Sequence, residues 1–163
     1  MTLKIILTSV LVVTIYGCYP IGVAAQTFSE IREKAVGMVE AKYPERETTH
    51  LEMTLKRVEE NQAFYNWQIT QNGKQRWIVI KIFYGKNQDE TAKFMEVSNG
   101  NIPTGPGRKR ANLGDEAYYS ENLRVDFARL RFRKANVYFD IQATTLKEAE
   151  EIAKGFDKFI KKK

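Results

Sequence analysis

Cysteine and histidine are almost absent from this sequence, whose 163 residues include one Cys, Cys18, and one His, His50. Because Cys18 lies near the N-terminus, the rest of the chain has no thiol and must be stabilised by a hydrophobic core rather than by disulfides. Zinc sites take several Cys or His ligands at regular spacing, so the sequence predicts no zinc site. No Gly-x-Ser-x-Gly elbow accompanies His50, which we interpret as a surface residue rather than a catalytic base.

The sequence also lacks a complete phosphate-binding motif. Gly100 and Gly105 have the spacing of the two glycines in a phosphate-binding loop, but Pro106 stands where that loop requires Lys. Asp115 and Glu116 are adjacent carboxylates, which would point to opposite faces of a strand and therefore cannot share one ligand. We interpret them, with the glycine before them, as part of a turn in which a carboxylate accepts backbone amides. These absences favour a non-enzymatic protein without a cofactor.

Residues 1–25 have the three zones of a secretory signal. A single lysine precedes a long, largely apolar run, and Val23 and Ala25 occupy the small-residue positions of a signal-peptidase site. Cleavage after Ala25 would leave residues 26–163 as a single mature domain, with no membrane span expected. Two alternatives are lipid attachment at Cys18 and an uncleaved signal that anchors the chain in the membrane. All three interpretations place the domain outside the cytoplasm, either secreted or periplasmic.

The mature domain is predicted to open with a helix and a half-buried strand. Thr27 and Glu30 fit a capping box that starts the helix, and Pro44 ends it. After a charged connection, the alternation of apolar and polar residues predicts a strand with three apolar side chains on one face: Leu51, Met53 and Leu55.

The Asn72-Gly73 dipeptide marks a β-hairpin, because it is the preferred type I′ turn. Counting outward from the turn gives one wholly apolar face that a helix must cover, formed by Tyr65, Trp67, Ile69, Ile78, Ile80 and Ile82. The opposite face carries Trp77, Val79 and Phe83 and is too aromatic for a purely solvated surface. We favour a second layer over these three residues, since helices often cover both faces of a sheet. The alternative is an exposed partner-binding patch.

A short helix over residues 87–98, which we expect Asp89 to cap, precedes a segment without periodicity. Residues 99–112 contain glycines, prolines and three consecutive cations and are predicted to form a flexible basic loop. The chain carries a formal net charge of +6. The cations of the loop are therefore candidate anion-binding residues for an anionic lipid, a glycan or another polyanion: Arg108, Lys109 and Arg110.

Residues 130–141 predict a second hairpin with Ala135-Asn136 at its tip. A two-residue turn pairs Lys134 with Val137; because a left-handed turn costs Ala about 1 kcal/mol, a longer turn is the alternative. One hairpin face is apolar, and the other carries a stripe that is a second candidate partner-binding surface: Arg129, Arg131, Arg133 and Tyr138. On this face we expect an exposed ion pair between Arg131 and Asp140. We also expect a cation–π contact between Arg133 and its cross-strand partner, Tyr138.

Three segments together resemble a motif shared by many small exported bacterial proteins of unknown function. They are Gly114-Asp115-Glu116-Ala117-Tyr118, the hairpin Phe132-Arg133-Lys134-Ala135-Asn136-Val137, and a terminal amphipathic helix whose capping box is Thr145 to Glu148. These proteins have a fold that is similar to PsbP and Mog1. The resemblance covers roughly the last third of the chain and departs at Ala135, where Gly is usual; it implies a fold and an export route, not a function.

The order of predicted elements gives an α+β domain with a largely antiparallel sheet of about six strands flanked by helices. With no catalytic constellation in the sequence, we expect an extracytoplasmic binding or accessory module for an unknown envelope protein. The alternative function is binding of a polyanion or an anionic membrane surface through the basic loop and the arginine stripe.

Overall fold

Seven strands form one antiparallel sheet in the computed structural model, which describes residues 26–101, 107–109, 112–122 and 127–161. The strands are β1 (Thr49–Val58), β2 (Gln62–Gln71), β3 (Lys74–Tyr84), β4 (Arg108–Lys109), β5 (Glu116–Asn122), β6 (Phe127–Lys134) and β7 (Val137–Ala143). They lie in the order β1-β2-β3-β7-β6-β5-β4. The predicted α+β class with a largely antiparallel sheet is confirmed. The predicted leader, residues 1–25, lies outside the described residues.

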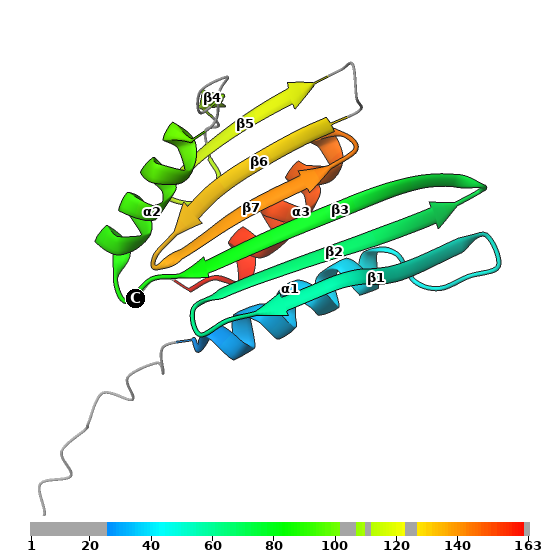
Figure 1. Ribbon diagram of the computed structural model, residues 1–163, viewed down its shortest axis with the longest axis horizontal. Helices are drawn as coiled ribbons and strands as arrows, with labels where there is room; N and C mark the ends of the chain where they lie inside the picture. The colour runs from blue at the N-terminus through cyan, green and yellow to red at the C-terminus, as the bar shows by residue number, and fades with distance from the viewer. Residues whose placement is uncertain (1–25, 102–106, 110–111, 123–126, 162–163) are drawn as a thin grey trace, which may run out of the picture.

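Among the described residues, three helices flank this sheet: α1 (Phe28–Lys42), α2 (Gln88–Gly100) and α3 (Leu146–Phe159). Figure 1 shows α1 and α3 side by side behind the sheet, with α1 behind β1 and β2 and α3 behind the central strands. Helix α2 lies on the other side, near one end of β6 and β7. In the described part of the chain, one face of the sheet is therefore covered by two helices and the opposite face by α2 alone.

The face toward α1 and α3 holds the main core. The predicted β2–β3 hairpin is confirmed: Trp67 pairs with Ile78 and Tyr65 with Ile80. Both turn residues of Asn72-Gly73 have the positive φ angles, 51° and 74°, that a type I′ turn requires. All six apolar side chains predicted for this face are at most 1% exposed. Strict alternation along two strands was enough to define this half of the core.

The helix ends combine confirmed and corrected predictions. At α1, Thr27 accepts a hydrogen bond from the Glu30 amide (3.2 Å), and Glu30 accepts one from the Thr27 amide (2.8 Å), which confirms the capping box. At α2 the predicted cap was wrong, because Asn87 rather than Asp89 accepts the Glu90 amide, at 2.9 Å. The side-chain oxygen of Asn87, two residues before Asp89, caps the helix, and Asp89 lies in the first turn.

Leu55 does not share a face with Leu51 and Met53, which corrects the prediction for β1. The pairing of β1 with β2 shifts register between Met53 and Leu55, so that Thr54 is the extra residue of a β-bulge. The bulge turns Leu55 to the opposite face, where its side chain is 48% exposed.

The β6–β7 hairpin has the predicted two-residue turn rather than the longer alternative. Lys134 pairs with Val137, and Ala135 adopts a φ of 52°. The turn is held by the segment before β5, as that segment's predicted turn role suggested. Asp115 accepts the Ala135 amide (2.7 Å) and donates its own amide to the Arg133 carbonyl (2.8 Å). A Cβ on Gly114 would lie 2.3 Å from that carbonyl, so only glycine allows this approach.

Candidate functional site

Helix α2 covers only part of the second sheet face. The Phe94 ring stacks on Phe83, with centroids 3.9 Å apart, and meets the Tyr138 ring edge-on at 5.4 Å. Phe83 is consequently only 6% exposed. The predicted second layer therefore exists over Phe83, whereas Trp77, farther along β3, is half-buried and Val79 is nearly buried.

A groove of about 710 Å³ lies between α2 and the strands β1 to β3. Its apolar lining follows a line across neighbouring strands, from Leu55 on β1 to Phe64 on β2 and Phe83 on β3, and reaches Phe94 on α2. Leu55 is 48% exposed and Phe64 half-buried, so apolar surface faces the groove. Three paired strands and the Phe83–Phe94 stack hold this lining in place.

Arg129 and Asp140 form a two-pronged ion pair at one side of the groove. Arg129 Nε donates to Asp140 Oδ1 at 2.8 Å and Nη2 to Oδ2 at 2.5 Å, and the Asp140 residue is 2% exposed. Burial disfavours the Arg129 charge, but its hydrogen bonds to Asp140 raise the pKa of the guanidinium overall. The pair is therefore charged and supplies no excess charge to the groove.

Arg131 is fully buried, which overturns the exposed ion pair predicted between Arg131 and Asp140. The predicted register is correct, since the two residues are cross-strand partners. However, α2 covers this position, and Arg131 Nη1 donates to Asn99 Oδ1 of α2 at 2.6 Å. Burial, followed by the nearby Arg129 charge, lowers the pKa of Arg131. The sequence could not reveal this burial because α2 is distant from β6 in the chain.

Arg133 also has a different partner from the one predicted. It lies across from Tyr138 in the sheet, but its Nε donates to Glu116 Oε2 on β5 at 3.0 Å, and its side chain is 20% exposed. The three residues of the arginine stripe are thus brought together on one face, as expected, but each donates to an oxygen of the protein itself. Their positive charge is largely neutralised or covered, so the stripe offers little attraction to a polyanion.

Lys81 and Tyr138 are two polar groups of the groove that keep unused binding capacity. Lys81 is exposed, and its ammonium lies 5.5 Å from the centre of the Phe64 ring without an ion pair among the described residues. Tyr138 is 2% exposed, and its hydroxyl lies beside Ser98 but makes no well-formed hydrogen bond with any described residue. Burial and the Asp140 charge raise the pKa of Tyr138, so the hydroxyl keeps its proton and can donate it.

The structure describes only part of the predicted basic loop 99–112. Residues 99 and 100 belong to α2, and Arg108 and Lys109 form β4, which pairs with Tyr118 and Tyr119 of β5. These two residues therefore belong to the edge of the sheet by backbone pairing, and the flexibility of the loop stays a prediction. Arg110 lies outside the described residues.

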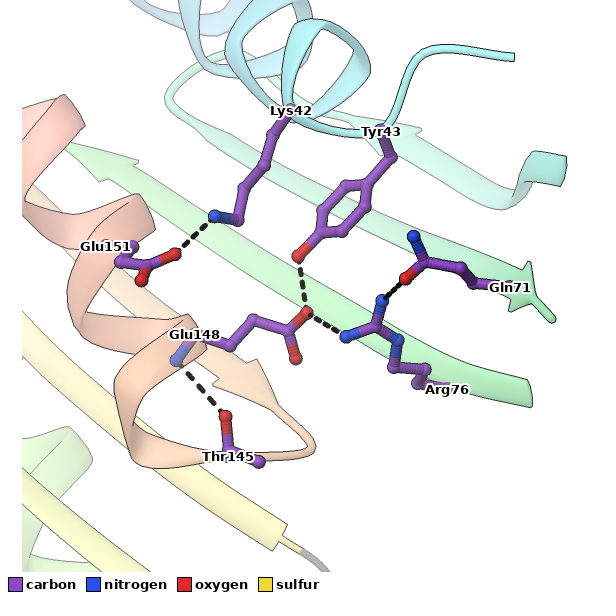
Figure 2. Close-up of polar contacts among 7 residues, drawn as sticks. All are labelled: Lys42, Tyr43, Gln71, Arg76, Thr145, Glu148 and Glu151. Carbon is purple, nitrogen blue, oxygen red and sulfur yellow. Dashed lines mark hydrogen bonds and ion pairs between the residues drawn. The ribbon is translucent and has the colours of Figure 1, made fainter. Parts of the chain in front are cut away.

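A second polar cluster lies on the other side of the sheet, where α1 ends and α3 begins (Figure 2). Glu148, 6% exposed, accepts the Tyr43 hydroxyl and Arg76 Nη1 (3.2 Å), while Arg76 also donates to Gln71. Burial, then the hydrogen bond to Glu148, raises the pKa of Tyr43. The cluster joins both helices to the β2–β3 hairpin, and none of its members lines the groove. We interpret it as a structural clamp.

Sequence reasoning missed this clamp because Glu148 fits a second capping box. Thr145 accepts the Glu148 amide at 3.2 Å, as predicted for the first half of that box. The Glu148 carboxylate instead turns inward to Tyr43 and Arg76, as Figure 2 shows. A fixed spacing from a cap predicts a local hydrogen bond, but it cannot reveal a competing partner elsewhere in the fold.

His50 is exposed and lies outside the groove. Its Nδ1 is 2.5 Å from Glu45 Oε1, and this hydrogen bond, strengthened by the carboxylate charge, raises the pKa of His50. Within the described residues, no group of three or more His, Cys, Asp or Glu side chains is arranged to hold a metal ion. In the same part of the chain, no helix has the length and apolar character needed to cross a membrane.

Comparisons with protein-family models, with curated proteins and with solved structures each found no match to this chain. The resemblance to small exported bacterial proteins with a PsbP- and Mog1-like fold therefore stays a prediction. The site has to be interpreted from its own geometry.

Proposed function

We propose that the domain is a non-enzymatic binding module outside the cytoplasm and that the groove between α2 and strands β1 to β3 is its binding site. The observation that carries the proposal is the half-covered second face, where one helix leaves apolar side chains exposed in a groove of about 710 Å³. Concave, largely apolar sites of a few hundred Å³ with a few polar groups are typical of ligand binding.

The contacts of Gln26 are compatible with the cleavage after Ala25 that the proposed export requires. The Gln26 side chain donates to the Phe159 carbonyl (3.0 Å) and accepts the Lys161 amide (2.9 Å), and its carbonyl accepts the Tyr84 hydroxyl (2.8 Å). Cleavage directly before Gln26 would leave all three of these contacts in place. Removal of the leader is thus compatible with the complete described fold.

The apolar lining alone supports only weak binding. Complete burial of a Leu or Phe side chain contributes about 1.5–3 kcal/mol, and Leu55 and Phe64 are already partly covered. Covering the rest of both side chains gives roughly 1–2.5 kcal/mol, which is less than the ~4 kcal/mol of a millimolar complex. Affinity must therefore come also from the polar groups of the groove.

The proposal can be tested with a photo-crosslinking amino acid placed in the full chain in its native cells. At Leu55 the reactive group would project into the groove, whereas at Glu40, exposed on α1 behind the sheet, it would not. We expect a discrete adduct from position 55 that is absent from position 40. Equal labelling at both positions, or no adduct at position 55, would refute the groove as the binding site.

A further inference from the structure

We propose that the groove takes a carboxylate with an extended aliphatic chain, with the carboxylate held by Lys81 and the chain lying over Phe64 toward Leu55. This inference rests on the proposed function and specifies its ligand. It follows from the charge balance of the groove, the line of its apolar side chains and the unsatisfied hydroxyl of Tyr138.

The charged side chains of the groove leave one cation in excess. Arg57 pairs with Glu59 at 2.6 Å and Arg129 with Asp140 at 2.5 Å, and all four side chains line the groove. Lys81 also lines the groove. Its cross-strand partner on β7 is Asp140, whose carboxylate is bonded to Arg129, and Lys81 makes no ion pair among the described residues. A single unpaired ammonium beside apolar surface favours an anion of low charge and disfavours both a cation and a polyanion.

The apolar side chains are arranged for an elongated body rather than a compact one. Leu55 pairs across β1 and β2 with Asn66, Phe64 follows two residues away on β2, and Lys81 is the cross-strand partner of Phe64 on β3. Neighbouring strands lie about 4.8 Å apart, so the floor from β1 to β3 spans roughly 10 Å. A hydrocarbon chain that begins at Lys81 can therefore run across Phe64 and end at Leu55.

Tyr138 supplies a second reason to expect an anionic head group. Its ring lines the groove, on the strand next to Lys81, and its protonated hydroxyl is buried without a well-formed hydrogen bond. A buried donor left unsatisfied is costly, and an acceptor oxygen from a ligand would remove that cost. A carboxylate has two oxygens, so one can accept from the Lys81 ammonium and the other from the buried Tyr138 hydroxyl once the Ser98 side chain beside it turns away.

The test uses three probes with the same chain and different heads: decanoate, decanol and decyltrimethylammonium, each below its micelle concentration. Backbone amide shifts of the folded domain are followed by NMR during titration. We expect decanoate to bind most tightly and to shift the amides around Lys81 and Phe64. Lys81→Gln, which keeps the aliphatic stem, should weaken decanoate about tenfold and leave decanol unchanged.

Matched variants separate the head group from the chain. Tyr138→Phe should weaken decanoate several-fold without affecting decanol, while Leu55→Ser should weaken both. Lys74→Gln, at an exposed lysine near the β2–β3 turn, is the control and should change neither. If decanol binds as tightly as decanoate at the groove, the anion is refuted and the proposed function stands. If no probe shifts the groove amides, the aliphatic ligand is refuted, and the Leu55 crosslink decides the proposed function independently.

Discussion

Asp140 should matter more for stability than Arg129, although the two form one ion pair. Asp140 is 2% exposed, bonded to Arg129 and directly across the sheet from the fully buried Arg131. Replacing Asp140 leaves two neighbouring guanidinium groups without its negative charge. Replacing Arg129 leaves Asp140 facing the opposite charge of Arg131. The variants Asp140→Asn and Arg129→Met should therefore differ in the free energy of unfolding.

The expected sizes follow from what each variant leaves behind. Removing the carboxylate from a buried pair costs about 3–5 kcal/mol, because the remaining charges stay in the interior. Losing Arg129 costs about 1–3 kcal/mol, as for other hydrogen bonds to a charged group that keeps a compensating neighbour. For a domain of this size, a difference of about 2 kcal/mol corresponds to roughly 5–10 °C in Tm.

Urea and thermal unfolding followed by circular dichroism would measure both variants and the double variant. We expect the double variant to be more stable than Asp140→Asn alone, since removing Arg129 also removes the like charge that lowers the pKa of Arg131. If Arg129→Met costs as much as Asp140→Asn, or if Asp140→Asn is neutral, the assigned charge arrangement is wrong.

Three further perturbations test other parts of the structure. Gly114→Ala should destabilise the domain by more than the ~1–2 kcal/mol of a left-handed alanine, since its Cβ would also lie 2.3 Å from a facing backbone carbonyl; wild-type stability in urea unfolding would contradict this packing. Glu148→Gln should cost about 1–3 kcal/mol in the same assay, because the buried acceptor loses its charge; an unchanged midpoint would show that the clamp is dispensable. By NMR titration, His50 should have a pKa above its usual 6.5 that falls towards that value in Glu45→Gln. Because the pKa of His50 is raised, the stabilisation by the His50–Glu45 pair is present below pH 6.5 and is lost as the pH rises through the folded His50 pKa. On the acid side, the pair loses its stabilisation as the pH falls through the lowered pKa of Glu45. A His50 pKa that Glu45→Gln leaves unchanged would contradict this pairing.

The sequence was sufficient for the hairpins and the main core because both depend on local alternation. From Asn72-Gly73 the pairing of Trp67 with Ile78 could be counted directly, and the structure has that register. The same counting from Ala135-Asn136 placed Arg131 opposite Asp140, also correctly. Counting failed for Leu55, because the bulge residue Thr54 turns the Leu55 side chain to the opposite face of the sheet. The alternation of apolar and polar residues in the sequence does not reveal this bulge.

The groove itself could be predicted only in fragments. The sequence indicated that Trp77, Val79 and Phe83 lay on a face needing a cover, but it did not show how far α2 would extend across that face. Phe94 stacks on Phe83 and leaves Phe64 on the neighbouring strand half-exposed. This position of α2 is a long-range packing outcome, and neither helical periodicity nor capping residues encode it.

Native mass spectrometry of the protein isolated from its own cells would show whether the half-covered face is a binding site. Leu55→Asp is the matched variant, because it adds a negative charge to the groove at a side chain that is 48% exposed and contributes little to the core. We expect a bound species to accompany the wild-type chain and to be lost from Leu55→Asp. An adduct that both chains retain equally, or a wild-type chain without any bound species, would contradict it.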